Sequence, residues 1–240
     1  MATENKQIKS KERVQNQGEV FTNEREVKEM CNLVGQECDR IDSRFLEPAC
    51  GNGNFLSEVL KRKLKSCEKK YKKNPYDYER FSVLAVSSIY GVDLMQDNAE
   101  ECRARLFEQW NAEYERICKT ACNNETRQAV IYILNRNILC GNALTLMQVD
   151  ENQQDTDKPI IFPEWSLIGG TKLKRRDFRL DVLLKANSKP DKKQKQMDMF
   201  EEDISEYLSI NPVTGEYMAE PIKIYRAVPY KKITEVNEDE

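Results

Sequence analysis

The protein has 240 residues, enough for one domain with appendages, and its formal net charge is −3 with a pI of about 5.5. Its charged fraction of 33% against 39% hydrophobic residues is polar for a globular chain, so part of the length is expected to be unpacked. The absence of histidine excludes Ser-His and Cys-His hydrolases. The negative charge excludes a generally basic DNA-binding surface.

The eight cysteines contain no C-x-x-C pair, and Cys118 and Cys122, one helical turn apart, make a poor zinc site. We therefore expect reduced thiols and no metal. The sequence has no apolar run long enough to span a membrane and no signal-peptide pattern in its polar start. The expected location is the cytoplasm.

Residues 1–17 are polar and are expected to form a flexible N-terminal segment. A helix capped by Thr22 or Asn23 is predicted next, because apolar residues recur at helical spacing from Val27 to Val34. An amphipathic surface helix is the ordinary interpretation of this stretch.

The most informative stretch runs from Phe45 to Phe55, with the sequence F-L-E-P-A-C-G-N-G-N-F. Its apolar start, its two glycines and the apolar-periodic segment that follows predict a strand, a tight turn and a helix. Gly51 and Gly53 permit positive φ and let a ligand approach the main chain. Glu47 lies at the carboxyl end of the strand, where ligands bind in open α/β sheets.

The phrase Glu-Pro-Ala-Cys-Gly-x-Gly-x-Phe resembles the first motif of S-adenosylmethionine-dependent DNA methyltransferases of the adenine-N6 type, and every fixed position is present. The resemblance implies an α/β fold with a Rossmann-like class I methyltransferase sheet in three αβα layers, with strand order 3-2-1-4. It also implies cofactor contacts from five residues of the phrase: Glu47, Ala49, Gly51, Gly53 and Phe55.

The earlier segment from Gly18 to Glu24 resembles the G-x-V-F/Y-T-P segment of the same family, which lies over the methionine end of the cofactor. Asn23 stands where proline is usual. The resemblance implies that Phe21 and Thr22 contact the cofactor.

The Asn-Pro-Tyr sequence at Asn74 is predicted to be a turn, because it lies between the first and second strands and not at the catalytic loop. The segment 81–93 includes the second strand and ends at Asp93, followed by Leu94. A carboxylate there suits the two ribose hydroxyls, although it could also cap the next helix. The distance from Gly53 exceeds the ~20 residues of a dinucleotide fold, which argues against a dehydrogenase.

A long helix or helix pair is predicted over 95–128, and 129–134 is either a strand or a buried helix. The sequence from Asn137 to Leu144 resembles the family segment Ile-x-x-Gly-Asp-Ala-Leu, whose acidic residue receives the adenine amino group. Asn142 replaces that acid and still offers a carbonyl acceptor. The resemblance therefore implies that Asn142 and Ala143 contact the adenine.

Residues 148–158 are predicted to form a polar loop, and 158–165 an extended edge segment. The stretch 172–179 carries five basic residues. It is interpreted either as a phosphate-facing patch or as a solvated loop. Four candidate DNA contacts follow from it: Lys172, Lys174, Arg175 and Arg176.

The stretch 178–190 is predicted to be an apolar strand that ends in Asn187, and it resembles the family loop Phe-Asp-x-Ile-x-x-Asn-Pro-Pro-Tyr. In that loop the Asn side chain accepts hydrogen bonds from the target amine, and the aromatic residue stacks on the extruded base. Asn187 and Pro190 are kept and are the catalytic candidates. The first proline and the aromatic residue are absent.

The expected organisation is a segment 1–17, a cofactor-binding domain 18–190 that is incomplete in its C-terminal half, and a charged, poorly packed tail 191–240. One interpretation is an enzyme of the family that works with a specificity subunit or a second methylase chain. The alternative is a non-catalytic module that binds the cofactor or a partner. Either way, we expect DNA binding to be weak and salt-sensitive.

Overall fold

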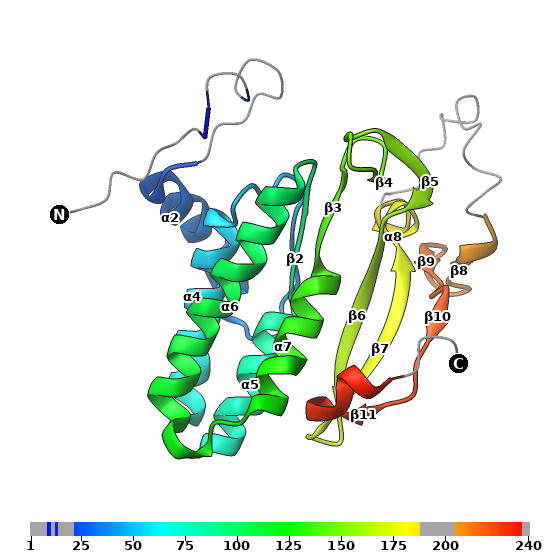
Figure 1. The fold of residues 1–240 in the computed structure, drawn as a ribbon. Helices are drawn as coiled ribbons and strands as arrows, with labels where there is room; N and C mark the ends of the chain where they lie inside the picture. The colour runs from blue at the N-terminus through cyan, green and yellow to red at the C-terminus, as the bar shows by residue number, and fades with distance from the viewer. Residues whose placement is uncertain (1–8, 11–12, 14–21, 188–204, 237–240) are drawn as a thin grey trace.

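The computed structural model describes residues 9–10, 13, 22–187 and 205–236 (Figure 1). Helices alternate with parallel strands as far as Asn142, and antiparallel strands dominate the rest. The longer helices are α2 (Glu24–Leu33), α3 (Gly35–Asp39), α4 (Asn54–Tyr71), α5 (Pro75–Ser87), α6 (Gln96–Cys118), α7 (Asn124–Asn137) and α8 (Leu180–Asn187). The strands are β1 (Phe45–Glu47), β2 (Ile89–Asp93), β3 (Ile138–Asn142), β4 (Met147–Val149), β5 (Asp155–Pro159), β6 (Ile161–Ile168), β7 (Lys172–Arg179), β8 (Leu208–Ile210), β9 (Tyr217–Ala219), β10 (Lys223–Ile224) and β11 (Val228–Pro229).

Strands β1, β2 and β3 are parallel and lie side by side in that order. Their register sets Glu47 level with Gly91 on the neighbouring strand, and Asp93 level with Cys140. The first two predicted strands and the order 3-2-1 are confirmed. Residues 129–134, predicted as either a strand or a buried helix, belong to helix α7, and the third strand follows at Ile138–Asn142. A fourth strand on the outer edge of β1 was also expected, but none pairs there within the described part of the chain.

Helices cover one face of these strands (Figure 1). A Cβ placed on Gly91 would lie 3.0 Å from Leu56 Cδ1, so this strand position faces helix α4. Trp110 of helix α6 is fully buried, stacks on Tyr114 at 4.7 Å between ring centroids, and donates a hydrogen bond of 3.0 Å to Ser82 Oγ on α5. The helices therefore form one packed layer against the sheet.

On the other face of the sheet, Tyr90 contacts a strand. Side chains alternate along a strand, so Tyr90 points away from the helices that Gly91 faces. Its hydroxyl donates a 2.8 Å hydrogen bond to the Pro163 carbonyl, and its ring meets Phe162 edge-on at 5.3 Å. Strand β6 occupies this position, so the observed arrangement is mixed α/β, and the expected three αβα layers are not seen here.

Three segments differ from their predicted secondary structure. Residues 147–159 form the β4–β5 hairpin and not a loop, because polar strands carry little alternating hydrophobic signal. The turn predicted at Asn74 is present, because α4 ends at Tyr71 and Asn74 N donates to Tyr71 O at 2.9 Å. Asn74 also caps α5 by accepting from Tyr76 N at 3.1 Å, and residues 81–87 belong to this helix and not to the second strand. The basic stretch 172–179 is strand β7, paired along its full length with β6, which confirms the extended segment before it.

The segment before Asn187 is helix α8 and not a strand. Leu180, Leu183 and Leu184 recur at helical spacing and line an apolar groove of about 390 Å³ together with Phe45 of β1. The expected order 3-2-1-4 places a fourth strand beside β1, and this segment does lie near β1. It forms no backbone ladder with β1 in the described part of the chain.

Residues 205–236 contradict the expectation of a poorly packed tail. Strands β10 and β11 pair with β7, and the 3-10 segment Tyr230–Glu235 packs on α7. Tyr230 and Ile233 are buried, and the Tyr230 hydroxyl donates to the buried carboxylate of Glu79. The C-terminal part is therefore tied to the helical layer.

Candidate functional site

A cavity of about 590 Å³ lies where β1, β2 and β3 end. Because parallel strands share a direction, their carboxyl ends meet at one edge of the sheet, and this edge is where ligands bind in open α/β folds. The cavity has both polar and apolar walls. It is lined by Thr22, Met30, Glu47, Pro48, Ala49, Cys50, Gly51, Asn52, Asn54, Phe55, Asp93, Leu94, Met95, Asn98, Gly141, Asn142, Ala143 and Leu144.

The glycine turn forms one wall. Gly51 has a φ of 52°, and its N–H donates a 2.8 Å hydrogen bond to Asp93 Oδ2. Gly53 has a φ of 84°, but it does not line the cavity. A Cβ on Gly53 would lie 2.6 Å from Cys102 Sγ, so this glycine is required for packing against α6 and not for the approach of a ligand.

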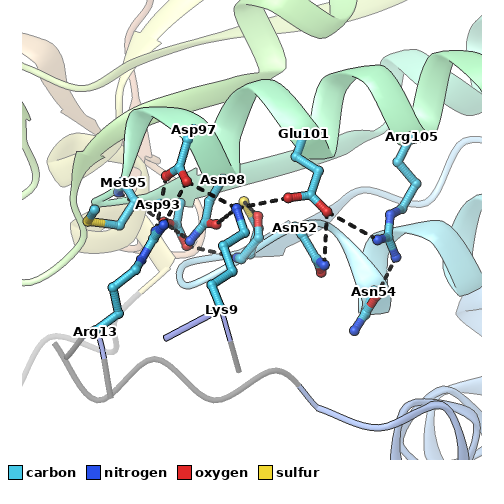
Figure 2. A network of polar contacts seen from close by, with 12 residues as sticks. Lys9, Arg13, Asn52, Asn54, Asp93, Met95, Asp97, Asn98, Glu101 and Arg105 are labelled. Carbon is cyan, nitrogen blue, oxygen red and sulfur yellow. Dashed lines mark hydrogen bonds and ion pairs between the residues drawn. The ribbon is translucent and has the colours of Figure 1, made fainter. Parts of the chain in front are cut away.

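Asp93 is almost fully engaged within the protein (Figure 2). Its Oδ2 accepts from Gly51 N, and its Oδ1 accepts from Met95 N at 2.9 Å and from Asn98 Nδ2 at 3.0 Å. A carboxylate has about four acceptor positions, so one position on Oδ2 remains. The predicted pair of ribose hydroxyls therefore needs an acceptor besides Asp93.

Asn52 supplies such an acceptor. Its Oδ1 is buried and, among the residues the structure describes, accepts no hydrogen bond, while its Nδ2 donates to Glu101 at 3.2 Å. A buried acceptor without a donor is costly, and a ligand hydroxyl or amine would satisfy it. Sequence reasoning passed over Asn52 because it occupies a variable position of the glycine phrase.

Glu47 is the second carboxylate of the cavity. Burial raises its pKa, and a backbone hydrogen bond from Ala49 offsets this only in part. A cationic group in the cavity would favour the ionised form and would compensate the desolvation. Glu47 and Asp93 therefore make the polar wall suitable for a positively charged ligand.

Apolar residues make up the rest of the lining. Phe55, Leu94 and Ala143, which remain predicted cofactor contacts, line the cavity, and Leu144 lines it with 95% of its surface exposed. Asn142 lines it too, but its Oδ1 accepts from Leu144 N at 3.0 Å, and its Nδ2 donates to Asp155 at 2.9 Å. Part of the acceptor capacity predicted for adenine is therefore used by the turn.

Of the two cofactor contacts predicted near the N-terminus, the structure describes one. Thr22 lines the cavity, and its carbonyl accepts from Asn54 Nδ2 at 3.1 Å, whereas Phe21 lies outside the described residues. Asn23 caps helix α2 by accepting from Glu26 N at 3.0 Å, which confirms the predicted cap. Helix α2 thus directs Met30, a lining residue missed by the sequence reasoning, to the rim.

The catalytic candidates are only partly described. Asn187 is the last residue of α8, and Pro190 lies outside the described residues. The start of α8 is held near the cavity loop by two hydrogen bonds of 2.9 Å, from Leu180 N to Ile160 O and from Ile160 N to Leu146 O. This ladder places α8 beside the loop that follows Asn142.

The predicted basic patch is largely neutralised within the fold. Arg175 is 7% exposed and forms a bidentate ion pair with Asp177, with N–O distances of 2.6 and 2.7 Å. Arg176 pairs with Glu164 across the β6–β7 ladder. Lys172 is exposed and Lys174 half-buried, which leaves these two lysines as the candidate phosphate contacts of the strand.

Comparison with known families decides the assignment. The sequence model described as "MmeI, DNA-methyltransferase domain" matches residues 22–211 of the 240 residues. The chain belongs to this DNA methyltransferase family. This MmeI-type domain is therefore a restriction–modification methyltransferase domain by family. No curated protein and no solved structure matched it.

The match spans both the cavity of the MmeI-type domain and the segment that carries Asn187. Among the described helices, none is both long enough and apolar enough to cross a membrane.

Proposed function

We propose that this MmeI-type domain binds S-adenosylmethionine in the cavity at the ends of β1, β2 and β3, and that its family reaction is methyl transfer to adenine N6 in DNA. The observation that carries the proposal is the juxtaposition of the preformed glycine turn, two carboxylates and an apolar wall in one cavity of about 590 Å³. The proposed place of action is the cytoplasm.

The residues fit the chemical groups of this cofactor. Glu47 and Asp93 suit its positive charge, which the sulfonium and the ammonium group supply. The remaining position on Asp93 Oδ2 and the unpaired Asn52 Oδ1 offer two acceptors for the ribose hydroxyls. Leu94 and Leu144 offer apolar surface to the adenine ring.

Bound S-adenosylmethionine would supply an electrophilic methyl group to the target amine. For the chain's own part, we propose Asn187 as the acceptor of the amine hydrogens, because it occupies the Asn position of the family loop. Orienting the amine lone pair is the contribution that such an acceptor makes. Pro190 would shape the same loop.

We propose DNA as the substrate, held weakly by the isolated chain, with Lys172 and Lys174 as its phosphate contacts. A specificity subunit or second methylase chain would supply target recognition. The second candidate function is a cofactor-binding or interaction module without turnover. It is favoured by the lack of an aromatic residue directly after Pro190 in the loop.

Calorimetric titration with S-adenosylmethionine and with its demethylated product tests the cofactor assignment. Ala49 is exposed at the cavity, so Ala49→Phe would fill it, and binding should weaken at least tenfold. Ala112→Phe, at an exposed position of α6 that does not line the cavity, is the matched control and should bind as wild type does. A folded wild-type chain without saturable binding at millimolar cofactor would refute the proposal.

A further inference from the structure

Two N-terminal cations lie against the first turns of helix α6 (Figure 2). Lys9 Nζ donates to Asn98 Oδ1 at 2.7 Å and lies 3.1 Å from Asp97 and 2.8 Å from Glu101. Arg13 binds Asp97 through both terminal nitrogens, at 2.6 and 3.0 Å. This group of two cations and two carboxylates is called the α6 clamp below.

The cations of the clamp are less exposed than the cation of an ordinary surface ion pair, although Asp97 and Glu101 remain 52% and 40% exposed. The side chains of Lys9 and Arg13 are 27% and 19% exposed, whereas Arg25, which pairs with Glu29 on α2, is 87% exposed. The Arg13 hydrogen bonds are the main cause that holds the pKa of Asp97 well below its usual range. Bidentate geometry and several charges in one group distinguish the clamp from pairs that contribute nothing measurable.

The clamp reaches the cavity through one buried amide. Asn98 is 1% exposed, and its Nδ2 donates to Asp93 Oδ1 while its Oδ1 accepts from Lys9. If the amide were turned round, its oxygen would face the acceptor Asp93 and its NH2 group would face the donor Lys9. Asp93 and the ammonium of Lys9 therefore fix the orientation of Asn98 together. On the other side, Glu101 joins Lys9 to Asn52 of the glycine turn.

We propose that Lys9 and Arg13 are positioning residues for the cofactor site: Lys9 orients Asn98, and through it Asp93, while Arg13 holds the neighbouring Asp97, and together they raise the affinity for S-adenosylmethionine. This role rests on the proposed function. Neither cation is among the residues that line the cavity, so both act through their partners. Because the clamp is held by charge at a partly exposed surface, added salt should weaken it.

Cofactor affinity at low and high salt is the first readout. We expect Lys9→Met and Arg13→Met each to raise the Kd about tenfold at low salt, and their affinity should respond less to salt than that of wild type. Arg25→Met removes an N-terminal arginine outside the clamp and should leave the Kd unchanged. Arg13→Asp and Asp97→Arg should each weaken binding, and their combination should restore it.

Amide hydrogen exchange without ligand is the second readout, and it separates this inference from the proposed function. Gly51 N and Met95 N both donate to Asp93, so both amides should exchange at least fivefold faster in Lys9→Met, while the helical amide of Leu60 stays as in wild type. If the wild-type chain bound no cofactor, the proposed function would be refuted. The exchange rates of the Gly51 and Met95 amides would still show whether Lys9 orders Asp93. Exchange and Kd within twofold of wild type would overturn the inference.

Discussion

The backbone N–H of Gly51 donates to Asp93 Oδ2 across 2.8 Å, although 42 residues separate the two in the chain. This bond ties the turn after β1 to the end of β2. Because Asp93 also accepts from Met95 N, one carboxylate orders both the glycine turn and the start of α6. The polar wall of the cavity is thus built within the protein before a ligand enters, which lowers the ordering cost of binding.

Gly53→Ala should destabilise the fold by about 1–3 kcal/mol. The new Cβ would meet Cys102 Sγ at 2.6 Å, and the φ of 84° is strained for alanine. Chemical denaturation at neutral pH under reducing conditions measures the effect. Adding Cys102→Ala to this variant should relieve the steric part and leave the backbone part.

Gly35→Ala is the matched control for that prediction. Gly35 begins helix α3, and a Cβ added there would meet no other described part of the chain within 4 Å. Alanine should therefore be neutral or stabilising by about 0.5–1 kcal/mol. Equal losses of stability in the Gly53 and Gly35 variants would contradict the packing role of Gly53.

Glu79→Gln should cost about 3–5 kcal/mol, because Glu79 is 2% exposed and the change leaves Lys231 without its partner carboxylate. Urea unfolding at pH 7 measures this loss. Glu115→Gln removes an exposed ion pair with Arg127 and should cost far less than Glu79→Gln does. Similar losses of unfolding free energy in the two variants would contradict the proposed importance of the buried Glu79–Lys231 pair.

The same variant tests a pH dependence. Burial opposes ionisation of Glu79, but hydrogen bonds from Lys231, Tyr114 and Tyr230 outweigh it and lower its pKa from the ordinary 4.5. The stabilisation is therefore fully present above pH 4.5 and is lost as the pH falls through the folded-state value. The difference in unfolding free energy between wild type and Glu79→Gln should shrink from pH 7 to pH 4. A constant difference would contradict the lowered pKa.

The glycine turn and the first two parallel strands could be predicted because each strand is a short apolar run that ends at a turn or a polar residue. The third strand was harder to place because the apolar run 129–134 before it suits a strand as well as a buried helix. Helix α8 was missed for a physical reason: a segment with Leu180, Leu183 and Leu184 is apolar enough to resemble a buried strand, and only the leucine spacing indicates a helix. The polar β4–β5 hairpin has no such signal.

Side-chain pairs across the fold were beyond reach of the sequence. Nothing local indicates that Lys9 meets Asn98, which lies 89 residues later. The pair Arg175 and Asp177 is different, because residues i and i+2 share a face only if the stretch is a strand, and 172–179 was not predicted as one. Counting basic residues therefore overstated the DNA-facing charge of β7, because the charge of Arg175 is paired inside the protein.

DNA binding by the isolated chain should be weak and should depend on Lys172 and Lys174. Their joint change to glutamine should flatten the dependence of affinity on salt by about two phosphate contacts and leave the fold intact. Fluorescence anisotropy with mixed-sequence DNA over a range of salt measures this. Arg175→Gln should instead lower stability by about 3–5 kcal/mol, since it leaves the buried carboxylate of Asp177 without its cation and with the Tyr225 hydroxyl as a neutral donor. Tight, sequence-specific binding by the lysine double variant would contradict the prediction.

The loop that follows Asn187 lacks the aromatic residue of the family loop. In the family loop an aromatic residue directly follows the second proline, and in this chain Asp191 directly follows Pro190, the proline that is kept. The spacing from Asn187 to this proline is one residue longer than in the family loop. Stacking on an aromatic side chain contributes about 1–3 kcal/mol per base. Its loss should lower the rate by about ten- to a hundredfold, so the purified chain alone should show very low or no methyl transfer to DNA.

Asp191→Tyr should therefore raise methyl transfer by about ten- to a hundredfold, measured as labelled methyl incorporation into mixed-sequence DNA. Asp191→Ala is the control and should leave the low rate unchanged, because it removes the charge without supplying a ring. Adding Asn187→Ala to the tyrosine variant should abolish the gain, since the ring would hold a base whose amine has lost its acceptor. Robust turnover by the wild-type chain would show that the ring is dispensable, and turnover that appears only when a second protein is added would assign recognition to that partner.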